Sequence, residues 1–160
     1  MNTGTVLTLA FGIGLIAGLR SMTAPAVVSW AAKLKWLDLQ HSSLSFLGSS
    51  VAAYILAVFA IGELIADKLP MTPSRIKPPG LIIRLVTGGL SGAALCAAAN
   101  QSLVIGGALG GLGGLIGALI GYQVRTRLVR ALRVPDFVIA LLEDAIAIAG
   151  GFFIASRFQI

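Results

Sequence analysis

Two pairs of carboxylates lie within segments that otherwise have the composition of membrane-spanning helices. Glu63 and Asp67 occur in AAYILAVFAIGELIADKLP, and Glu143 and Asp144 occur in DFVIALLEDAIAIAGGFF. A carboxylate is costly to insert into a bilayer, so such a residue normally faces a bundle interior or a water-filled cavity. These four residues are therefore the first candidates for a binding site.

The spacing of the four acids predicts that they meet. Glu63 and Asp67 share one helix face because they are four residues apart. Glu143 and Asp144 are adjacent and diverge by about 100° around their helix, so only one of them is expected to face the first pair. Glu63 and Glu143 each lie about 10 Å along a helix from ends that we expect on the same side of the membrane.

Three basic residues are candidate partners of these acids. Arg84 lies five residues into its helix from the same side and is the expected counter-ion, with Lys68 at the mouth of the site. Arg20 is expected near the opposite surface and replaces Arg84 only if the topology differs. Four acids against one or two arginines favour either a bound cation or protonated carboxylates. The alternative is a structural polar network that joins the helices.

The composition identifies the class of protein that carries these charges. The 160 residues are 57% hydrophobic and 11% charged, with a mean hydropathy of +0.95, whereas soluble domains have about 25% charged residues. One crossing needs about 20 apolar residues, so about five crossings use most of the chain. We expect one all-α integral membrane domain over residues 1–160. The expected helices, in a Gly-rich bundle, cover about 3–34, 48–69, 79–99, 102–133 and 135–156.

Other residues limit what the chain binds. A single cysteine, Cys96, excludes an internal disulfide framework, and with the lone His41 it argues against a zinc or iron site, so no metal or cofactor is expected. The net charge of +6 is explained by basic loops that face anionic lipid rather than nucleic acid. The N-terminus lacks the basic start of a secretory signal and is interpreted as a retained helix. Pro25 is expected to kink this first helix, because proline lacks a donor and clashes with the preceding turn.

Glycines recur at four-residue spacing in three of the expected helices. Small residues at this spacing let helices approach closely, which matters in lipid because there is no hydrophobic drive for association. The helix over 102–133 has the most glycines and is expected to be the central packing helix. Its glycines serve contacts within one chain or contacts in a homo-oligomer. The packing positions are Gly14, Gly18, Gly88, Gly92, Gly106, Gly110, Gly114, Gly117 and Gly121.

Basic residues predict the orientation of the chain in a cytoplasmic (inner) membrane. The expected sides are unequal, with seven basic residues against four. The positive-inside rule then places the N-terminus in the cytoplasm and the C-terminus outside. An even number of crossings, as when the segment around Trp30 re-enters the membrane, overturns this orientation. The seven are Lys68, Arg75, Lys77, Arg125, Arg127, Arg130 and Arg133, and the four are Arg20, Lys33, Lys35 and Arg157.

Four strings in the chain carry a family resemblance. They are GLRSMTAPAVVSW, GELIADKLP, PPGLIIRLVTGGLSGA and LEDAIAIAGG. Together they resemble the bacterial membrane-protein family catalogued as domain of unknown function 4126, over most of the chain. The most specific part is E-x-x-x-D-K-x-P followed by L-E-D-A. The resemblance implies a membrane protein and again points to Glu63, Asp67, Lys68, Glu143 and Asp144.

A weak internal similarity aligns GLIAGLRSMT from Gly14 with GALIGYQVRT from Gly117. Each string is followed by a helix with an acidic pair. If the two halves cross the membrane in opposite directions, this similarity indicates an inverted repeat of the kind found in transporters.

Three functions are compatible with these features. The first is a small transporter or an ion- or proton-conducting protein that binds a cation or proton at the carboxylates. The second is a non-enzymatic scaffold or assembly factor in which the polar network is structural. The third is a lipid head-group enzyme using Lys68, Arg75 and Lys77, which is not expected because the chain has no recognisable nucleophile or metal motif such as HExxH. The partners expected are the lipid bilayer, a cation or proton, and a second copy of the chain if the glycines serve oligomer contacts.

Overall fold

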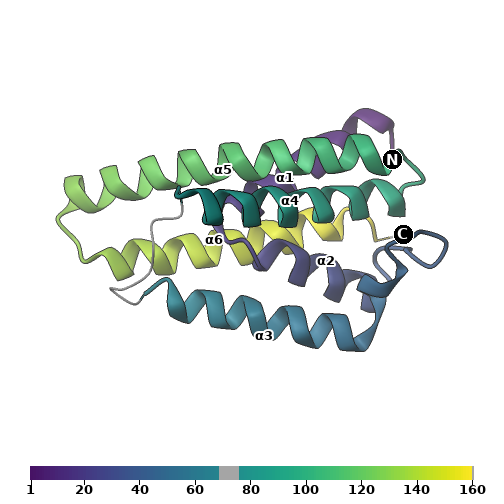
Figure 1. The fold of residues 1–160 in the computed structure, drawn as a ribbon, viewed down its shortest axis with the longest axis horizontal. Coiled ribbons are helices and arrows are strands. Elements are labelled where there is room, and N and C mark those ends of the chain that lie inside the picture. The colour runs from purple at the N-terminus through teal and green to yellow at the C-terminus, as the bar shows by residue number, and fades with distance from the viewer. Residues whose placement is uncertain (69–75, 160) are drawn as a thin grey trace.

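The helices of the protein lie side by side along one direction, as Figure 1 shows for the computed structural model. The structure describes residues 1–68 and 76–159, and no strand occurs in these ranges. The expected all-helical fold is confirmed. In chain order the elements are α1 (Thr3–Leu19), α2 (Thr23–Lys33), the 3-10 turn η1 (Ser45–Gly48), α3 (Ser50–Ala66), α4 (Pro78–Ala98), α5 (Leu103–Leu132) and α6 (Asp136–Ser156).

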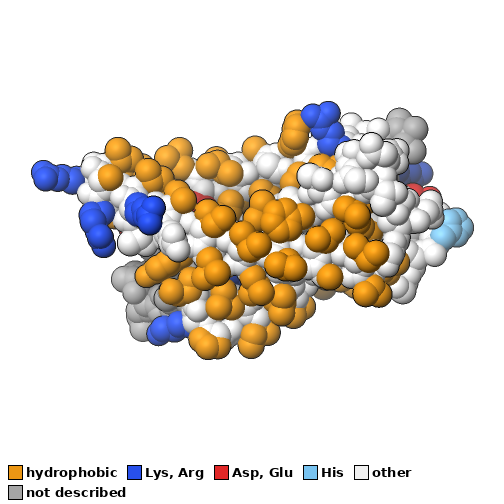
Figure 2. Space-filling view, turned by 90° about the horizontal axis from the view of Figure 1, so that it is seen from above, with side chains coloured by type: hydrophobic (Ala, Val, Ile, Leu, Met, Phe, Trp, Pro, Cys, Tyr) orange, Lys and Arg blue, Asp and Glu red, His pale blue; other side chains and the backbone are white. Residues whose placement is uncertain are grey.

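Three helices in the described ranges, α4, α5 and α6, are long and apolar enough to cross a membrane. The helices α1 and α3 are apolar but have 17 residues each, and α2 has 11. Large hydrophobic side chains such as Val58, Val86, Val104 and Ile146 are exposed on the outside of the bundle. Figure 2 shows such side chains over the middle of the molecule and several Lys and Arg side chains at the end where α5 finishes. This surface suits a membrane protein.

The chain reverses direction between α1 and α2. α1 ends at Arg20, whose backbone is extended (φ −138°, ψ 106°), and α2 starts at Thr23 and runs back alongside the bundle (Figure 1). Pro25 is the third residue of α2, where its missing N–H costs no helical hydrogen bond. The predicted kink at Pro25 is therefore wrong, and the expected helix over 3–34 is two helices joined by a turn.

Glycines line the contacts that α5 makes with α1 and α4. A Cβ atom added at Gly14, Gly18, Gly88 or Gly92 would lie under 3.0 Å from backbone atoms of α5. Gly14 lies at Gly110 and Gly18 at Gly114, so α1 and α5 are parallel. Gly92 lies at Gly106 and Gly88 at Gly110, so α4 and α5 are antiparallel. These backbones approach more closely than any larger side chain would allow.

The parallel packing of α1 and α5 changes two expectations. The strings that suggested an inverted repeat lie on helices that run in the same direction, so they are not related by inversion. Both chain ends also lie at one end of the bundle (Figure 1), and Gly12 of α1 lies beside Ile154 near the end of α6. This arrangement does not fit termini on opposite faces, because α2 returns the chain to its starting side.

The helix α3 lies at the edge of the bundle. It packs mainly on α2 and η1, and its buried residues are Ala53 and Ala60. Near its start, the ring of Tyr54 packs edge-on against Trp30 of α2 at 5.5 Å. Near its end, the charged side chains described below attach it to the rest of the molecule. α3 is thus held most strongly at its two ends.

Candidate functional site

Charged side chains from four helices, α3 to α6, and from the α1–α2 turn meet inside one end of the bundle. We call this group the ion-pair cluster. It contains the seven charged residues that the sequence identified and two more. Its members are Arg20, Glu63, Asp67, Lys68, Arg84, Arg125, Asp136, Glu143 and Asp144.

Arg20 lies at the centre of the cluster. Its side chain is 0% exposed and forms ion pairs with Asp67 at the end of α3 and with Asp144 of α6, where Nη2 lies 2.5 Å from Oδ1. The carboxylate of Glu143 lies 3.9 Å from the same nitrogen. The expected position of Arg20 near the opposite surface is wrong, because α1 runs parallel to α5 and ends among the acids. Arg20 thereby joins the α1–α2 turn to α3 and α6.

Glu63 binds the start of α2. Its Oε1 accepts hydrogen bonds from the Ser21 N–H at 2.9 Å and the Ser21 hydroxyl at 2.6 Å, and its Oε2 accepts one from the Met22 N–H at 2.7 Å. The first N–H groups of a helix have no intrahelical acceptor and carry partial positive charge. No side chain within α2 or at its N-cap, Met22, provides this cap. A carboxylate from α3 therefore binds the N–H groups of the N-cap residue Met22 and of Ser21, immediately before the first turn of α2.

Arg84 serves the end of α1 in a similar way. It is 5% exposed, and its Nε–H donates to the carbonyl of Gly18 at 3.0 Å. Its Nη2 lies 3.8 Å from Oε1 of Glu63. The pairing of Arg84 with the first acidic pair is thus present, while Arg20 contacts both pairs. Together Glu63 and Arg84 satisfy backbone groups on either side of the α1–α2 turn.

Lys68 lies at the edge of the cluster. Its Nζ donates to Oδ2 of Asp144 at 2.7 Å and to the carbonyl of Leu64 at 2.8 Å. Its side chain is 30% exposed, compared with 10% for that of Asp144. This placement agrees with the expectation that Lys68 lies at the mouth of the site. Glu143 and Asp144 both belong to the cluster, although only one of them was expected there.

Arg125 and Asp136 are cluster members that the sequence reasoning missed. The Nε–H of Arg125 donates to Oδ1 of Asp136 at 2.8 Å, and a second, shorter bond joins the same two side chains. Nη1 of Arg125 also lies 3.4 Å from Oε2 of Glu143. Arg125 lies seven residues before the end of α5, and Glu143 lies seven residues after the start of α6. Their equal distance from the connecting loop was the signal that could have found this contact.

The charges within the cluster nearly balance. Among the described residues it has four cations and five carboxylates, which gives a formal charge of 4 − 5 = −1. The expected excess of two or three negative charges is therefore too large, because Arg20, Lys68 and Arg125 add positive charge. Arg75 lies outside the described residues. In the ranges that the structure describes, no group of three or more His, Cys, Asp or Glu side chains could hold a metal ion.

Two buried polar atoms near the turn have no hydrogen-bond partner in the described part of the chain. They are Nε of Arg20 and the hydroxyl oxygen of Thr23. Thr23 is the first residue of α2. The α1–α2 turn thus leaves polar groups unsatisfied on both of its sides.

A family model described as Domain of unknown function (DUF4126) matches residues 7–156. The chain belongs to this family. The match to DUF4126 includes the whole ion-pair cluster, and it confirms the resemblance seen in the sequence motifs. No curated protein and no solved structure matches the chain.

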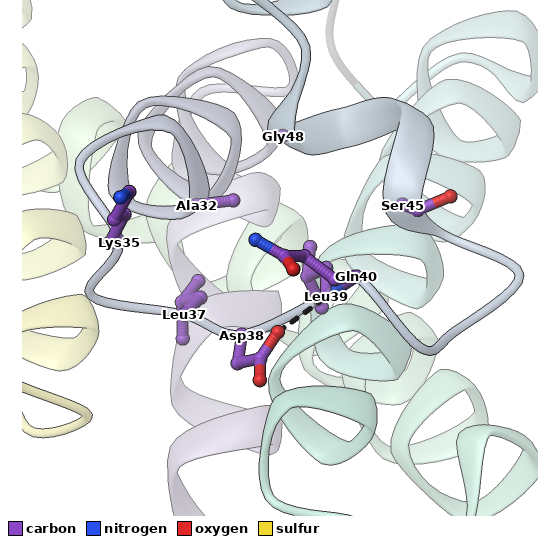
Figure 3. A pocket seen from close by; sticks show the side chains of 8 residues that line it. All are labelled: Ala32, Lys35, Leu37, Asp38, Leu39, Gln40, Ser45 and Gly48. Carbon is purple, nitrogen blue, oxygen red and sulfur yellow. Dashed lines mark hydrogen bonds between the residues drawn. The ribbon is translucent and has the colours of Figure 1, made fainter.

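A separate hollow lies between α2 and η1, in the loop that joins them. It has a volume of about 350 Å³ and is lined by residues including Lys35, Asp38, Gln40 and Ser45 (Figure 3). Oδ1 of Asp38 accepts a hydrogen bond from the Gln40 N–H at 3.1 Å. Asp38 is exposed and belongs to none of the ion pairs of the cluster. It therefore offers a matched acidic control for substitutions within the cluster.

Proposed function

We propose that this DUF4126 protein is a small membrane transporter in which proton binding at the ion-pair cluster controls the attachment of α3. The observation that carries the proposal is the position of Arg20, which is fully buried and shared by a carboxylate of α3 and a carboxylate of α6. Charged residues within membrane segments typically pair with one another and lie on ion or proton pathways.

The near balance of charge favours a proton over a larger cation as the bound species. When every carboxylate faces a cation, adding one proton to an acid removes a negative charge and leaves the cation without its partner. Such a change weakens a specific ion pair without needing room for an ion. The ion pairs from Arg20 to Asp67 and from Lys68 to Asp144 connect α3 with the turn and α6.

The packing of α3 supports a movement of this helix. Between its two ends it presents Val58, Phe59 and Ile61 outward, each more than half exposed. Few side chains hold its middle against the bundle. Loss of the charged contacts at its end would therefore release α3 from the bundle more readily than α1 or α4, which pack closely against α5. Small sliding movements of packed helices are one of the ways in which proteins change between states.

A flux experiment tests this proposal. The purified protein is reconstituted into liposomes that contain a pH-sensitive dye, and proton flux is measured for wild type, Glu143→Gln, Asp144→Asn and the control Asp38→Asn. We expect the two cluster variants to lose flux and the control to keep it. Equal flux for wild type and Glu143→Gln at every pH would refute the proposal.

The near neutrality of the cluster also favours a second candidate, a scaffold in which the ion pairs are structural. In that case Glu63→Gln and Glu143→Gln should reduce thermal stability in proportion to any activity that they reduce. A transporter instead predicts at least one cluster variant that folds with wild-type stability and has lost flux. Measuring both quantities on the same preparations separates the two functions.

A further inference from the structure

A groove lies between α3 and α6 and is floored by α2. It has a volume of about 260 Å³, and its lining includes Thr23 and Trp30 of α2, Ala57 and Leu64 of α3, and Ile148 and Phe152 of α6. We call it the α3–α6 groove. On its two sides, Ile61 of α3 is 56% exposed and Ile148 of α6 is 39% exposed. The groove therefore reaches the outer apolar surface of the bundle.

Thr23 carries the hydroxyl group of a lining that is otherwise hydrophobic apart from the indole N–H of Trp30. It is 3% exposed, and its hydroxyl oxygen is buried without a hydrogen-bond partner in residues 1–68 and 76–159. A buried polar group normally has a partner, so each exception needs an explanation. The groove is therefore more than a gap between apolar side chains.

The position of Thr23 explains why the protein supplies no partner. The hydroxyls of Thr8, Thr87 and Thr126 each donate to the carbonyl four residues earlier in the same helix. Thr23 is the first residue of α2 and follows the non-helical turn at Arg20, so no helical turn precedes it. A water molecule is a poor substitute, because a buried water needs two to four polar partners.

We propose that the α3–α6 groove binds one acyl chain of a bilayer phospholipid, whose ester carbonyl accepts a hydrogen bond from the Thr23 hydroxyl. The groove runs from Thr23 to Trp30 along α2, which is about 10 Å. This length is about a third of a bilayer hydrocarbon core, so it suits the upper part of one chain. In such a lipid the ester carbonyl joins the acyl chain to the polar head group, so it lies next to Thr23 when the chain fills the groove.

The charge at the Thr23 end fits the same orientation of the lipid. Leu64 lines this end of the groove, and its carbonyl accepts a hydrogen bond from Nζ of Lys68. Lys68 is partly exposed at the edge of the bundle. The phosphate of the lipid head group therefore lies at the Thr23 end of the groove, on the same side as the Lys68 ammonium. This inference does not depend on the proposed transport, because the lining of the groove carries no charge.

Native mass spectrometry of the delipidated protein tests the proposal. The protein is titrated with a diester phosphatidylglycerol and with the diether analogue that has the same head group and chain length. We expect wild type to bind one diester lipid about two- to tenfold more tightly than the diether lipid, which is the effect of one net hydrogen bond. Thr23→Val should lose this difference, Thr23→Ser should keep it, and the control Thr126→Val should behave as wild type.

A second variant tests the groove itself. Ala57→Leu places a larger side chain in the groove and should weaken the binding of both lipids at least tenfold. Equal affinity of wild type for the two lipids, or unchanged binding by Ala57→Leu, would overturn the proposal. So would a dimer that excludes lipid and that Ala57→Leu dissociates, since a second copy would then occupy the groove. If Ala57→Leu does not fold, the comparison of diester and diether lipids in the Thr23 variants decides the question.

Discussion

The guanidinium of Arg20 and the carboxylate of Asp144 lie 2.5 Å apart in the interior of the bundle, at the point where α1 ends and α2 begins. Arg20 also pairs with Asp67 of α3. One buried side chain thus connects the turn with two helices that are far from it in sequence. Asp144 in turn binds Lys68 at 2.7 Å, so the two basic residues share one acid between them.

Replacement of Arg20 should strongly destabilise the fold. Arg20→Met removes the cation from the buried Asp144 and from the partly buried Asp67, and loss of one partner of a buried pair costs about 3–5 kcal/mol. The free energy of unfolding in detergent micelles, from denaturant titration followed by circular dichroism, measures this effect. Arg130→Met is the control, because Arg130 is exposed and its loss should change stability by less than about 0.5 kcal/mol. Equal stabilities for the two variants would show that Arg20 is not structurally important.

Replacement of Glu63 should act on the start of α2. Glu63→Ala removes the acceptor of the Ser21 and Met22 N–H groups, and loss of a hydrogen bond to a charged group typically costs about 1.5–3 kcal/mol. Hydrogen exchange of these two amides should accelerate markedly, while exchange in the middle of α5 should stay as in wild type. Glu63→Gln keeps one carbonyl acceptor and should give an intermediate result. Unchanged protection in Glu63→Ala would contradict the role of Glu63 in holding the start of α2.

The sequence predicted the helices better than their directions. The ends of α3 to α6 fall within three residues of the predicted ranges, because Pro70, Pro78 and the polar residues before Ser102 interrupt the apolar runs. The reversal at Arg20 was missed, because Pro25 is an obvious helix breaker by composition yet is harmless in a first turn. The direction of α1 depended on that reversal, and with it the placement of Arg20.

The candidate site was predictable in part for a related reason. Buried acids in apolar segments stand out in any sequence, so Glu63, Asp67, Glu143 and Asp144 were found at once. Arg125 was hidden because it begins a run of arginines, and basic residues at the end of a long helix are normally assigned to the membrane surface. Only the packing of α5 beside α6 shows that Arg125 faces Glu143.

Glycines at the α5 contacts should not tolerate a methyl group. A Cβ at Gly110 would come under 3.0 Å from the backbone of Gly88, so Gly110→Ala must push α4 and α5 apart and should cost about 1–3 kcal/mol. Gly62 of α3 is a matched control, since nothing lies within 4 Å of its added Cβ. Gly62→Ala should stabilise the protein by about 0.4–1 kcal/mol, because alanine is the better helix former. Thermal unfolding of the two variants in one detergent should therefore shift in opposite directions.

Both chain ends should be accessible from one side of the membrane and the end of α5 from the other. α1 and α5 are parallel and α6 is antiparallel to both, so Thr3 and Gln159 lie at the same end while Arg130 lies at the opposite end (Figure 1). Single cysteines at these three exposed positions, in a Cys96→Ala background, can be labelled in intact cells with a thiol reagent that does not cross membranes. The positive-inside rule predicts labelling at positions 3 and 159 and none at position 130 until the cells are opened, because the arginine-rich end of α5 should face the cytoplasm. Labelling of positions 3 and 159 from different sides would contradict the helix directions. Labelling of position 130 alone in intact cells would agree with the helix directions but would mean that the protein has the opposite orientation in the membrane.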